Sequence, residues 1–250
     1  MMGTVKSIIG LSKEKLAECL DPQSFTRKLS GEEIIYLAKT FDACWEYDYQ
    51  AAANGKIGRH AVLKCGSHSD IFFNSKIFLS NDNVREIVAR QLVMRYRLQP
   101  SAERPDWVVG IPDGAKELGK DVARILKSRL AVMTKENGQM KLESRISPYA
   151  SVLMVEDLCT QGTGLKDAVR EVLAKQPRAL VLWHELAVVD RGGLGHVNIS
   201  DVHEFTVVSL AQLKVNDWPP DYCPLCHAGS KPIKPKTTDE NWQLLIRSQL

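Results

Sequence analysis

The sequence predicts an α/β fold built on a mostly parallel sheet flanked by helices, and three observations support this expectation. Apolar stretches of strand length alternate with amphipathic stretches of helix length between about residues 82 and 210, which is typical of consecutive βαβ units. The apolar stretches, such as "WVVG" and "SVLMV", are almost uninterrupted, as in strands that are buried on both faces of a sheet. A loop of small polar residues follows one of these strands, at the edge where α/β sheets bind ligands.

The first part of the chain, residues 1–55, is expected to be helical. Ser30 and Glu33 have the spacing of a capping box, which marks the start of a helix. The apolar residues that follow fall on one helical face: Ile34, Leu37, Ala38 and Phe41. We expect this helix to continue to the break at "NGKIGRH". Beyond the break, "AVLKCGSHSDIFFNSKIF" is typical of two short strands on either side of "CGSHSD".

The expected elements then alternate along the chain. Helices are predicted over "NVREIVARQLVMRYRL", "AKELGKDVARILKSRL" and "LKDAVREVLAKQ". Strands are predicted over "DWVVGI", "AVMT", "SVLMV", "ALVLWHELAVVD" and "FTVVSL". A polar stretch, "KENGQMKLESRISPYA", separates the second and third of these strands and is expected to be a loop.

The composition excludes several classes of protein. The chain has 250 residues, 44% of them hydrophobic, which is enough for a sizeable core. The net charge of +3 is mild and no dense Lys/Arg block occurs, so a nucleic-acid surface is not indicated. No apolar stretch approaches the roughly 20 residues of a membrane span, and a cytoplasmic location is expected. The six cysteines are scattered and are expected to be reduced thiols.

The stretch "VLMVEDLCTQGTG", Val152–Gly164, ends a strand in two carboxylates and a small-residue loop. The backbone N–H groups of the loop, at the positive end of the helix that follows, would form a cradle for an anion. Two acids beside an anion must face something else, such as sugar hydroxyls or a cation. A sugar phosphate meets both demands, whereas the alternative is a solvated turn with residues that cap the helix.

This stretch resembles the phosphoribosyl pyrophosphate (PRPP) motif of the type I phosphoribosyltransferases. In that family, the two acids hold the ribose 2′ and 3′ hydroxyls and the loop holds the 5′-phosphate. The resemblance implies a set of PRPP-binding residues: Glu156, Asp157, Thr160, Gln161, Gly162, Thr163 and Gly164. It also implies the type I phosphoribosyltransferase fold, with an N-terminal hood that binds the acceptor base.

Two other stretches indicate the base. "VLKCGSHSDIFFN", Val62–Asn74, resembles the N-terminal signature of orotate phosphoribosyltransferases, with Cys65 in place of the usual Ser. "AVVDRGGLG" resembles the segment whose Arg pairs with the base carboxylate, and a guanidinium pairs with a carboxylate in a bidentate manner. The residues implied to bind an acidic planar base are Lys64, Phe72, Phe73 and Arg191. The alternatives are a Phe pair in the core and an Arg in a surface turn.

Two loops are expected to handle the pyrophosphate. "VVGIPDGAKELG" resembles the pyrophosphate-binding loop and supplies Gly110, Asp113 and Gly114, with Mg²⁺ as the expected ion. "TKENGQMKLESR" stands where the family has its mobile catalytic loop. Lys135 and Glu136 match that loop, but Thr134 replaces an Arg, the expected His is absent, and Lys141 or Arg145 would have to reach the pyrophosphate. The candidate catalytic residues are therefore Lys135, Lys141 and Asp157.

The departures in the catalytic loop leave two hypotheses. The first is an enzyme that transfers 5-phosphoribose from PRPP to orotate or a similar acidic pyrimidine, acting as a homodimer as the resemblance implies. The second is a non-catalytic regulatory protein that binds PRPP or a nucleotide, because loss of one charge-stabilising group typically costs about a hundredfold in rate.

The segment "CPLCHAGSKPIKPK" places Cys223 and Cys226 in a Cys-x-x-Cys pattern before His227. The two thiols suggest a zinc half-site, with His227 as a further candidate ligand, since a zinc site needs about four ligands. His196 or His203 could complete it only if the fold brings one of them near, and a second copy of the chain could complete it across a dimer. The alternatives are a metal-free structural element, a haem attachment pattern and a redox pair. The expected organisation is thus a helical extension over 1–55, a phosphoribosyltransferase domain with its hood over 56–215, and a Cys-x-x-Cys tail over 216–250.

Overall fold

The computed structural model describes residues 7–199 and 203–250, and the chain divides into two compact units. The first unit comprises Met1–Leu37 and Phe78–Leu213, and the second comprises Ala38–Ile77 and Lys214–Leu250. The three domain ranges expected from the sequence divide the chain at other positions than these units do. The segment after Lys214 shares a core with residues 38–77. Each unit is described below by itself.

The first unit contains a six-stranded sheet in the order β11-β12-β10-β9-β5-β6. Its strands are β5 Trp107–Gly110, β6 Arg129–Ala131, β9 Ser151–Cys159, β10 Leu180–Asp190, β11 His196–Ile199 and β12 His203–Gln212. All neighbouring pairs are parallel except β11 with β12, which is antiparallel. The expected α/β class and mostly parallel sheet are therefore confirmed, and β11 is an edge strand that the sequence pattern did not indicate.

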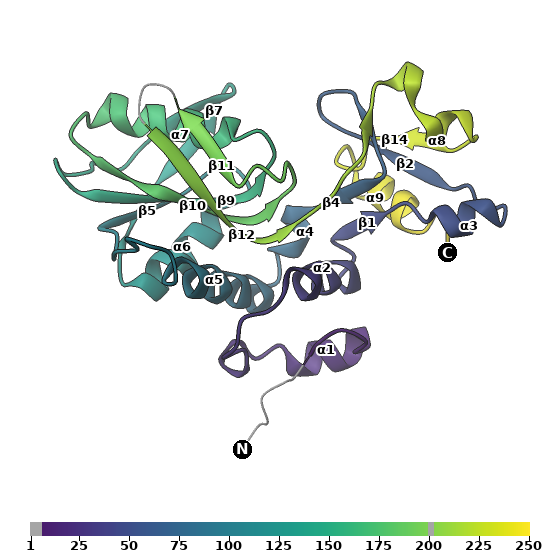
Figure 1. Cartoon of the computed structure of the whole chain (residues 1–250), viewed down its shortest axis with the longest axis horizontal. Helices are drawn as coiled ribbons and strands as arrows, with labels where there is room; N and C mark the ends of the chain where they lie inside the picture. The colour runs from purple at the N-terminus through teal and green to yellow at the C-terminus, as the bar shows by residue number, and fades with distance from the viewer. Residues whose placement is uncertain (1–6, 200–202) are drawn as a thin grey trace. The chain divides into compact units, whose positions relative to one another are not determined.

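Three long helices cover this sheet: α5 Asp82–Tyr96, α6 Lys116–Leu126 and α7 Thr163–Lys175. Helices α5 and α6 pack together on one face, and α7 covers the other (Figure 1). On the α7 side, Val152 and Met154 of β9 pack with Leu165 and Val169. Strand β9 is buried on both faces, as its uninterrupted apolar sequence predicts.

The N-terminal helices of the chain are α1 Lys13–Cys19, the 3₁₀ turn Pro22–Ser24 and α2 Gly31–Thr40. The predicted capping box is confirmed, since Glu33 N donates to Ser30 Oγ at 3.1 Å and Ser30 N donates to a Glu33 carboxylate oxygen at 2.9 Å. The predicted continuation of α2 to the break near residue 54 is wrong. Asp42 adopts a left-handed conformation with φ of 55°, and the chain continues as strand β1 Cys44–Glu46 and helix α3 Tyr49–Ala53.

The second unit holds two small sheets. One has the order β13-β3-β2-β14, formed by β2 Arg59–Val62, β3 His68–Ser69, β13 Asp217–Trp218 and β14 Lys231–Ile233. The other pairs β1 with β4 Ile71–Phe73. The remaining helices are α4 Ser75–Phe78, the 3₁₀ turn Pro220–Tyr222, α8 Pro224–His227 and α9 Asp239–Ile246. The buried apolar cluster draws on both stretches of chain: Trp45, Tyr47, Ala61, Cys223, Leu225, Trp242 and Leu245.

The polar stretch after β6 is a β-hairpin in its first half, so the expectation of a loop is wrong there. Strands β7 Met133–Glu136 and β8 Gln139–Leu142 pair antiparallel. The turn residues Asn137 and Gly138 both have positive φ, at 50° and 83°, which is the conformation that Asn-Gly adopts in tight hairpins. Met133, Met140 and Leu142 are buried in the core of the first unit, and this packing keeps the hairpin on the unit.

Candidate functional site

Strand β9 delivers the two adjacent acids to the carboxyl end of the sheet, between β10 and β5. Successive side chains of a strand point to opposite faces, so Glu156 and Asp157 diverge. Glu156 is buried and Asp157 is half-buried. Each acid lies against a glycine: a Cβ at Gly164 would overlap a Glu156 carboxylate oxygen, and a Cβ at Gly114 would overlap the Asp157 carboxylate. Only glycine allows both loops to approach the strand end this closely.

The loop after β9 has the features of an anion cradle. Gly162 has φ of 66° and is the N-cap residue of α7, and glycine adopts this left-handed conformation without strain. Because glycine has no side chain to cap the helix, the first N–H groups of α7 keep their capacity to bind an anion. Thr160 is half-buried, whereas Gln161 and Thr163 are exposed. The loop therefore presents backbone and hydroxyl donors at its surface.

The loop after β5 lies beside the motif, as the sequence predicts. Ile111 N donates to Val155 O of β9 at 2.8 Å, and Gly114 lies against Asp157. The Pro112–Asp113 peptide bond is cis. Gly110 is in tight backbone contact with the start of α6, where a Cβ would overlap Ala115 O. Asp113 is exposed, and its carboxylate lies 3.6 Å from Lys116 Nζ.

The turn after β10 completes this end of the sheet. Asp190 is fully buried and accepts hydrogen bonds from Leu194 N at 3.1 Å and Gly195 N at 3.2 Å, which fixes the turn. Arg191 N donates to Cys159 O at 2.8 Å. A Cβ at Gly192 would overlap Thr160 O. The backbone of the turn that carries Arg191 therefore lies directly against the loop that follows β9.

The two candidate catalytic lysines lie on opposite faces of the β7–β8 hairpin. Lys135 is opposite Met140 in the register and lies on the same face of the hairpin. Its positive charge lowers the pKa of Glu156, but burial and the neighbouring Glu185 raise that pKa by more. Lys141 lies on the other face, where its Nζ is 3.4 Å from carboxylate oxygens of Glu136 and Glu143. These two carboxylates raise the pKa of Lys141. The structure thus orients Lys135, and not Lys141, towards the motif.

Glu185 of β10 is a site residue that the sequence analysis missed. It is fully buried, and one carboxylate oxygen of Glu185, one of Glu156 and the Cys159 sulfur lie within 4.8 Å of one another. Glu156 Oε2 and both Glu185 oxygens accept no hydrogen bond from any described residue. Burial, and then the neighbouring Glu185, raise the pKa of Glu156, and burial also raises that of Glu185. Burial and the proximity of the two carboxyl groups therefore favour a protonated form of the pair, and the protonation of one group depends on that of the other.

A signal for Glu185 was present in the sequence. It is an acid in the middle of the apolar stretch "ALVLWHELAVVD", and a charged residue is almost never fully buried unless it is paired. Its partner could not be identified from the sequence, because Glu156 lies on a different strand.

The residues expected to bind the base, Lys64, Phe72 and Phe73, belong to the second unit. Lys64 is exposed in the turn between β2 and β3, while Phe73 is buried, with 3% of its surface exposed. Phe72 is half-buried, with its ring 5.9 Å from the Trp242 ring and 5.8 Å from Lys236 Nζ. Of the two phenylalanines, Phe72 is the more exposed.

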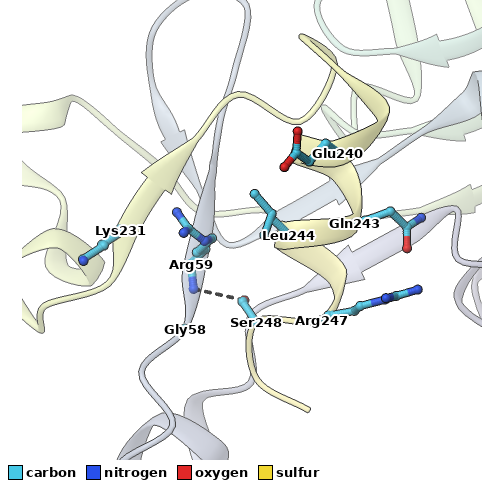
Figure 2. Close-up of a pocket in the computed structure, with 8 residues that line it drawn as sticks. All are labelled: Gly58, Arg59, Lys231, Glu240, Gln243, Leu244, Arg247 and Ser248. Atoms are coloured by element: carbon cyan, nitrogen blue, oxygen red, sulfur yellow. Dashed lines mark hydrogen bonds between the residues drawn. The ribbon is translucent and has the colours of Figure 1, made fainter.

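Two open pockets lie away from the predicted site residues. The first, of about 420 Å³, belongs to the second unit and is lined by Gly58, Arg59, Lys231, Glu240, Gln243, Leu244, Arg247 and Ser248 (Figure 2). Figure 2 shows the hydrogen bond between two of these residues, from Arg59 N to Ser248 Oγ, and its length is 3.0 Å. The second, of about 630 Å³, lies in the first unit beside Arg27 and Arg95. Neither is lined by a residue of the motif.

A parallel sheet whose central strand ends in two acids, between a glycine loop at a helix N-terminus and a second glycine loop after the neighbouring strand, is the arrangement of the type I phosphoribosyltransferases. The sequence is 30% identical to the orotate phosphoribosyltransferase of Caldicellulosiruptor saccharolyticus over 178 residues, which cover 70% of this chain and 87% of that protein. It is 29% identical to the enzyme of the same name from Caldicellulosiruptor bescii over 184 residues, covering 73% and 90%. No family profile matches the sequence. The chain belongs to the type I phosphoribosyltransferase family and is related to its orotate phosphoribosyltransferases.

Solved structures agree with the fold. Leishmania donovani UMP synthase matches with a TM-score of 0.52 and 16% identity, over 84% of this chain and 41% of that one. Orotate phosphoribosyltransferase from Aeropyrum pernix matches with a TM-score of 0.50 and 21% identity, over 72% and 95%. Among the described residues, no helix has the length and apolar character that crossing a membrane requires.

Proposed function

We propose that this protein transfers 5-phosphoribose from PRPP to orotate or a similar acidic pyrimidine base and releases pyrophosphate. The observation that carries the proposal is the end of β9, where Glu156 and Asp157 lie against Gly164 and Gly114. A carboxylate pair beside a backbone anion cradle suits a ligand that has both hydroxyls and a phosphate. The relatives named orotate phosphoribosyltransferase support the choice of base.

In this proposal each loop at the strand end binds one part of PRPP. The N–H groups and hydroxyls of the Thr160–Gly164 loop bind the 5′-phosphate, and backbone donors of the stretch Gly110–Gly114 bind the pyrophosphate. Glu156 and Asp157 accept hydrogen bonds from the ribose hydroxyls. The roles of Lys64, Phe72 and Arg191 in binding the base rest on the family resemblance and stay predictions.

The carboxylates at this site fit a magnesium ion. Mg²⁺ prefers oxygen ligands and keeps several waters. Asp113 lies beside Gly114 on the loop after β5, and the Asp157 carboxylate of β9 lies against that glycine. When bound with PRPP, the ion would neutralise charge on the departing pyrophosphate. These two carboxylates would hold it directly or through its waters.

The chemistry is the substitution of one bond at C1′ of the ribose. A ring nitrogen of the base gives up its proton to solvent and forms a bond to C1′ while the bond from C1′ to the pyrophosphate oxygen breaks, and the pyrophosphate leaves with the bonding electron pair. Most of the rate gain in such a reaction comes from positioning and from fixed charges near the leaving group. Lys135 is the cation of the hairpin that faces the motif, so we assign it the charge-stabilising role.

The test is an assay with the purified protein, Mg²⁺, PRPP and orotate, in which orotidine monophosphate is measured by chromatography. We expect product that depends on all three additions, and the same assay with other acidic pyrimidines defines the base. Asp157→Asn should lower the rate by about a hundredfold, whereas Asp167→Asn, at an exposed position on α7, should leave it unchanged. Absence of product with every base tested would contradict the proposal.

A second candidate function is regulatory binding of PRPP without turnover. The observation that favours it is the position of Lys141, which pairs with Glu136 and Glu143 on the outer face of the hairpin. Under this alternative, PRPP raises the melting temperature, as any ligand of the native state does, but no product forms. A variant with Glu156→Ala and Asp157→Ala should lose that shift under both functions, and a shift that persists would refute the assignment of the motif.

A further inference from the structure

Four side chains with metal-ligating atoms meet in the interior of the second unit. They are His60 of β2, His68 of β3, and Cys223 and Cys226 of the Cys-x-x-Cys segment, and one ligand atom from each lies within 4.8 Å of all the others. His60 and Cys223 are fully buried, and His68 is 6% exposed. The cluster lies outside the strand end that carries the PRPP motif, and the proposed function does not use it.

The distances between these atoms match a tetrahedral site. His60 Nε2 lies 3.0 Å from His68 Nδ1, 3.6 Å from Cys223 Sγ and 3.5 Å from Cys226 Sγ. Cys226 Sγ lies 3.3 Å from His68 Nδ1. A tetrahedral Zn²⁺ with bonds of about 2.3 Å to sulfur and 2.0–2.1 Å to nitrogen separates neighbouring N and S atoms by about 3.5 Å and two N atoms by about 3.3 Å. The three N–S distances given are close to these values, the N–N distance is slightly shorter, and the remaining two pairs of atoms lie within 4.8 Å.

The histidine at the centre of the cluster is oriented by a second hydrogen bond. His60 Nδ1 lies 2.9 Å from Ser230 Oγ, and that hydroxyl donates to Gly58 O at 3.3 Å. With that hydroxyl donating to the carbonyl, the serine oxygen is free to accept from an Nδ1–H of His60. In this tautomer Nε2 has a lone pair available to a metal ion. Metal-ligating histidines are typically oriented in this manner.

The backbone of the second unit brings the ligands together from distant parts of the sequence. In the antiparallel β2–β3 pair, Val62 is opposite His68, so His60 and His68 lie on one face as diagonal neighbours. On the other side, Cys223 is the N-cap residue of α8 and Cys226 lies within it. The turn after α8 closes through Gly229 N, which donates to Cys226 O at 2.9 Å.

We propose that His60, His68, Cys223 and Cys226 bind one structural Zn²⁺ ion that joins the β2–β3 pair to the C-terminal segment. Two sulfur and two nitrogen ligands in a tetrahedron select zinc among the common divalent ions. Four protein ligands leave no open position, so the ion stabilises the fold and takes no part in group transfer. The strands that it joins are only two to four residues long, and a metal cross-link stabilises a unit with such short elements.

This ligand set corrects the one considered from the sequence. Cys223 and Cys226 belong to the cluster, but His196 and His203 lie on β11 and β12 of the other unit. His227, which follows the Cys-x-x-Cys pattern directly, is exposed and is not among the four clustered residues.

The primary test is the metal content of the full-length chain purified without a histidine tag. We expect about one Zn²⁺ per chain, and a content below about 0.2 would overturn the proposal. His68→Gln and Cys226→Ser should each lower the content severalfold, whereas His227→Gln is the matched control and should retain it. If His227→Gln loses zinc as readily as His68→Gln, the assigned ligand set is wrong.

A second test uses the wild-type chain and does not depend on how the variants fold. Protein produced with Co²⁺ should show the visible absorption of a tetrahedral site and a charge-transfer band from thiolate to cobalt, and added Zn²⁺ should abolish both. Extraction of the metal with a chelator should lower the melting temperature and increase hydrogen exchange in residues 59–69 and 223–233. A disulfide between Cys223 and Cys226 in the purified protein, detected by mass spectrometry, or a chelator without effect on exchange, would refute the site.

Discussion

At the scale of single residues, Glu33 ties two parts of the first unit together. Its carboxylate accepts from both terminal nitrogens of Arg27, at 2.8 and 2.5 Å, and from Ser30 N and Ile8 N. The hydrogen bonds from Arg27, aided by those from the backbone, lower the pKa of Glu33 to about 2. A carboxylate with a lowered pKa stabilises the folded state above its unfolded pKa and loses that contribution as the pH falls to its folded pKa.

Glu33→Gln should therefore destabilise the protein at neutral pH, by roughly 2–3 kcal/mol in the free energy of unfolding. The difference from wild type should shrink as the pH falls from about 4.5 to about 2. Denaturant unfolding at several pH values measures both effects. Glu32→Gln, at an exposed position on the same helix, is the control, and a difference that does not depend on pH would contradict the ion-pair explanation.

The pair formed by Glu156 and Glu185 has the opposite pH dependence. Because the pKa of both groups is raised in the folded state, the stability is greatest when the pair holds its protons, and it falls as the pH rises above about 4.5. Glu185→Gln removes one charge and leaves an amide that can donate to Glu156. We expect this variant to be as stable as wild type near pH 5 and more stable near pH 8, as measured by thermal unfolding.

A matched control for this comparison is Glu117→Gln on α6, whose side chain is 65% exposed. It should unfold like wild type at every pH. If the stability of Glu185→Gln relative to wild type does not increase between pH 5 and pH 8, the two carboxyl groups are not coupled.

Gly162 is required by the loop after β9 for two reasons. Its φ is 66°, and a Cβ there would lie 2.6 Å from a Val197 methyl group. Gly162→Ala should cost about 1–3 kcal/mol through backbone strain and abolish the rise in melting temperature caused by PRPP. Gly193→Ala separates the backbone strain from the steric overlap. Gly193 has φ of 60°, but no atom lies within 4 Å of a Cβ added there. It should show the strain and keep the PRPP response.

At the scale of elements, the β7–β8 hairpin separates the two candidate lysines. Side chains alternate between the two faces along each strand. Lys135 therefore lies on the inner face with its partner Met140, and Lys141, the next residue after Met140, lies on the outer face. If the protein is a transferase, Lys135→Ala should lower kcat by about a hundredfold and Lys141→Ala by much less. Steady-state kinetics at saturating PRPP measures both. Equal losses would show that the hairpin rearranges when the substrate binds.

The elements also show where local sequence patterns fail. The capping box at Ser30 was predicted correctly, because both hydrogen bonds join residues three positions apart. The end of that helix was predicted wrongly, because Cys44 and Trp45 of β1 pair with Phe73 and Phe72 of β4. Pairing with a strand that lies some thirty residues away overrides the helical period, and no local pattern reveals it.

At the scale of the whole chain, the C-terminal segment builds part of a core with residues from near the beginning. Trp242 of α9 is 2% exposed, and its indole nitrogen donates to Asp42 O at 2.9 Å. Trp242→Ala should cost about 3–5 kcal/mol, whereas Trp242→Phe keeps most of the buried area and should cost about 1 kcal/mol for the lost hydrogen bond. Denaturant unfolding, monitored by circular dichroism, measures the loss of stability in both variants. Similar losses in the two variants would mean that α9 is not packed as described.

The sequence by itself determined the features that are contiguous in the chain. The strand, the two acids, the glycine turn and the helix of Val152–Gly164 follow one another directly. Their order predicts the α/β class, which is confirmed, and a phosphoribosyl ligand, which stays a prediction. The neighbouring loop at Gly110–Gly114 and the turn at Arg191 could be predicted as well, because carboxyl ends of adjacent parallel strands meet at one edge of the sheet.

The tertiary structure alone decided which distant groups become partners. Glu185 joins Glu156 because β10 pairs with β9, and His60 and His68 join the two cysteines because the C-terminal segment packs against β2 and β3. The first contact depends on the pairing of two strands. The second depends on packing between residues more than a hundred positions apart. The physical reason is that buried polar groups must find partners wherever the fold supplies them, and the sequence around each group does not identify that partner.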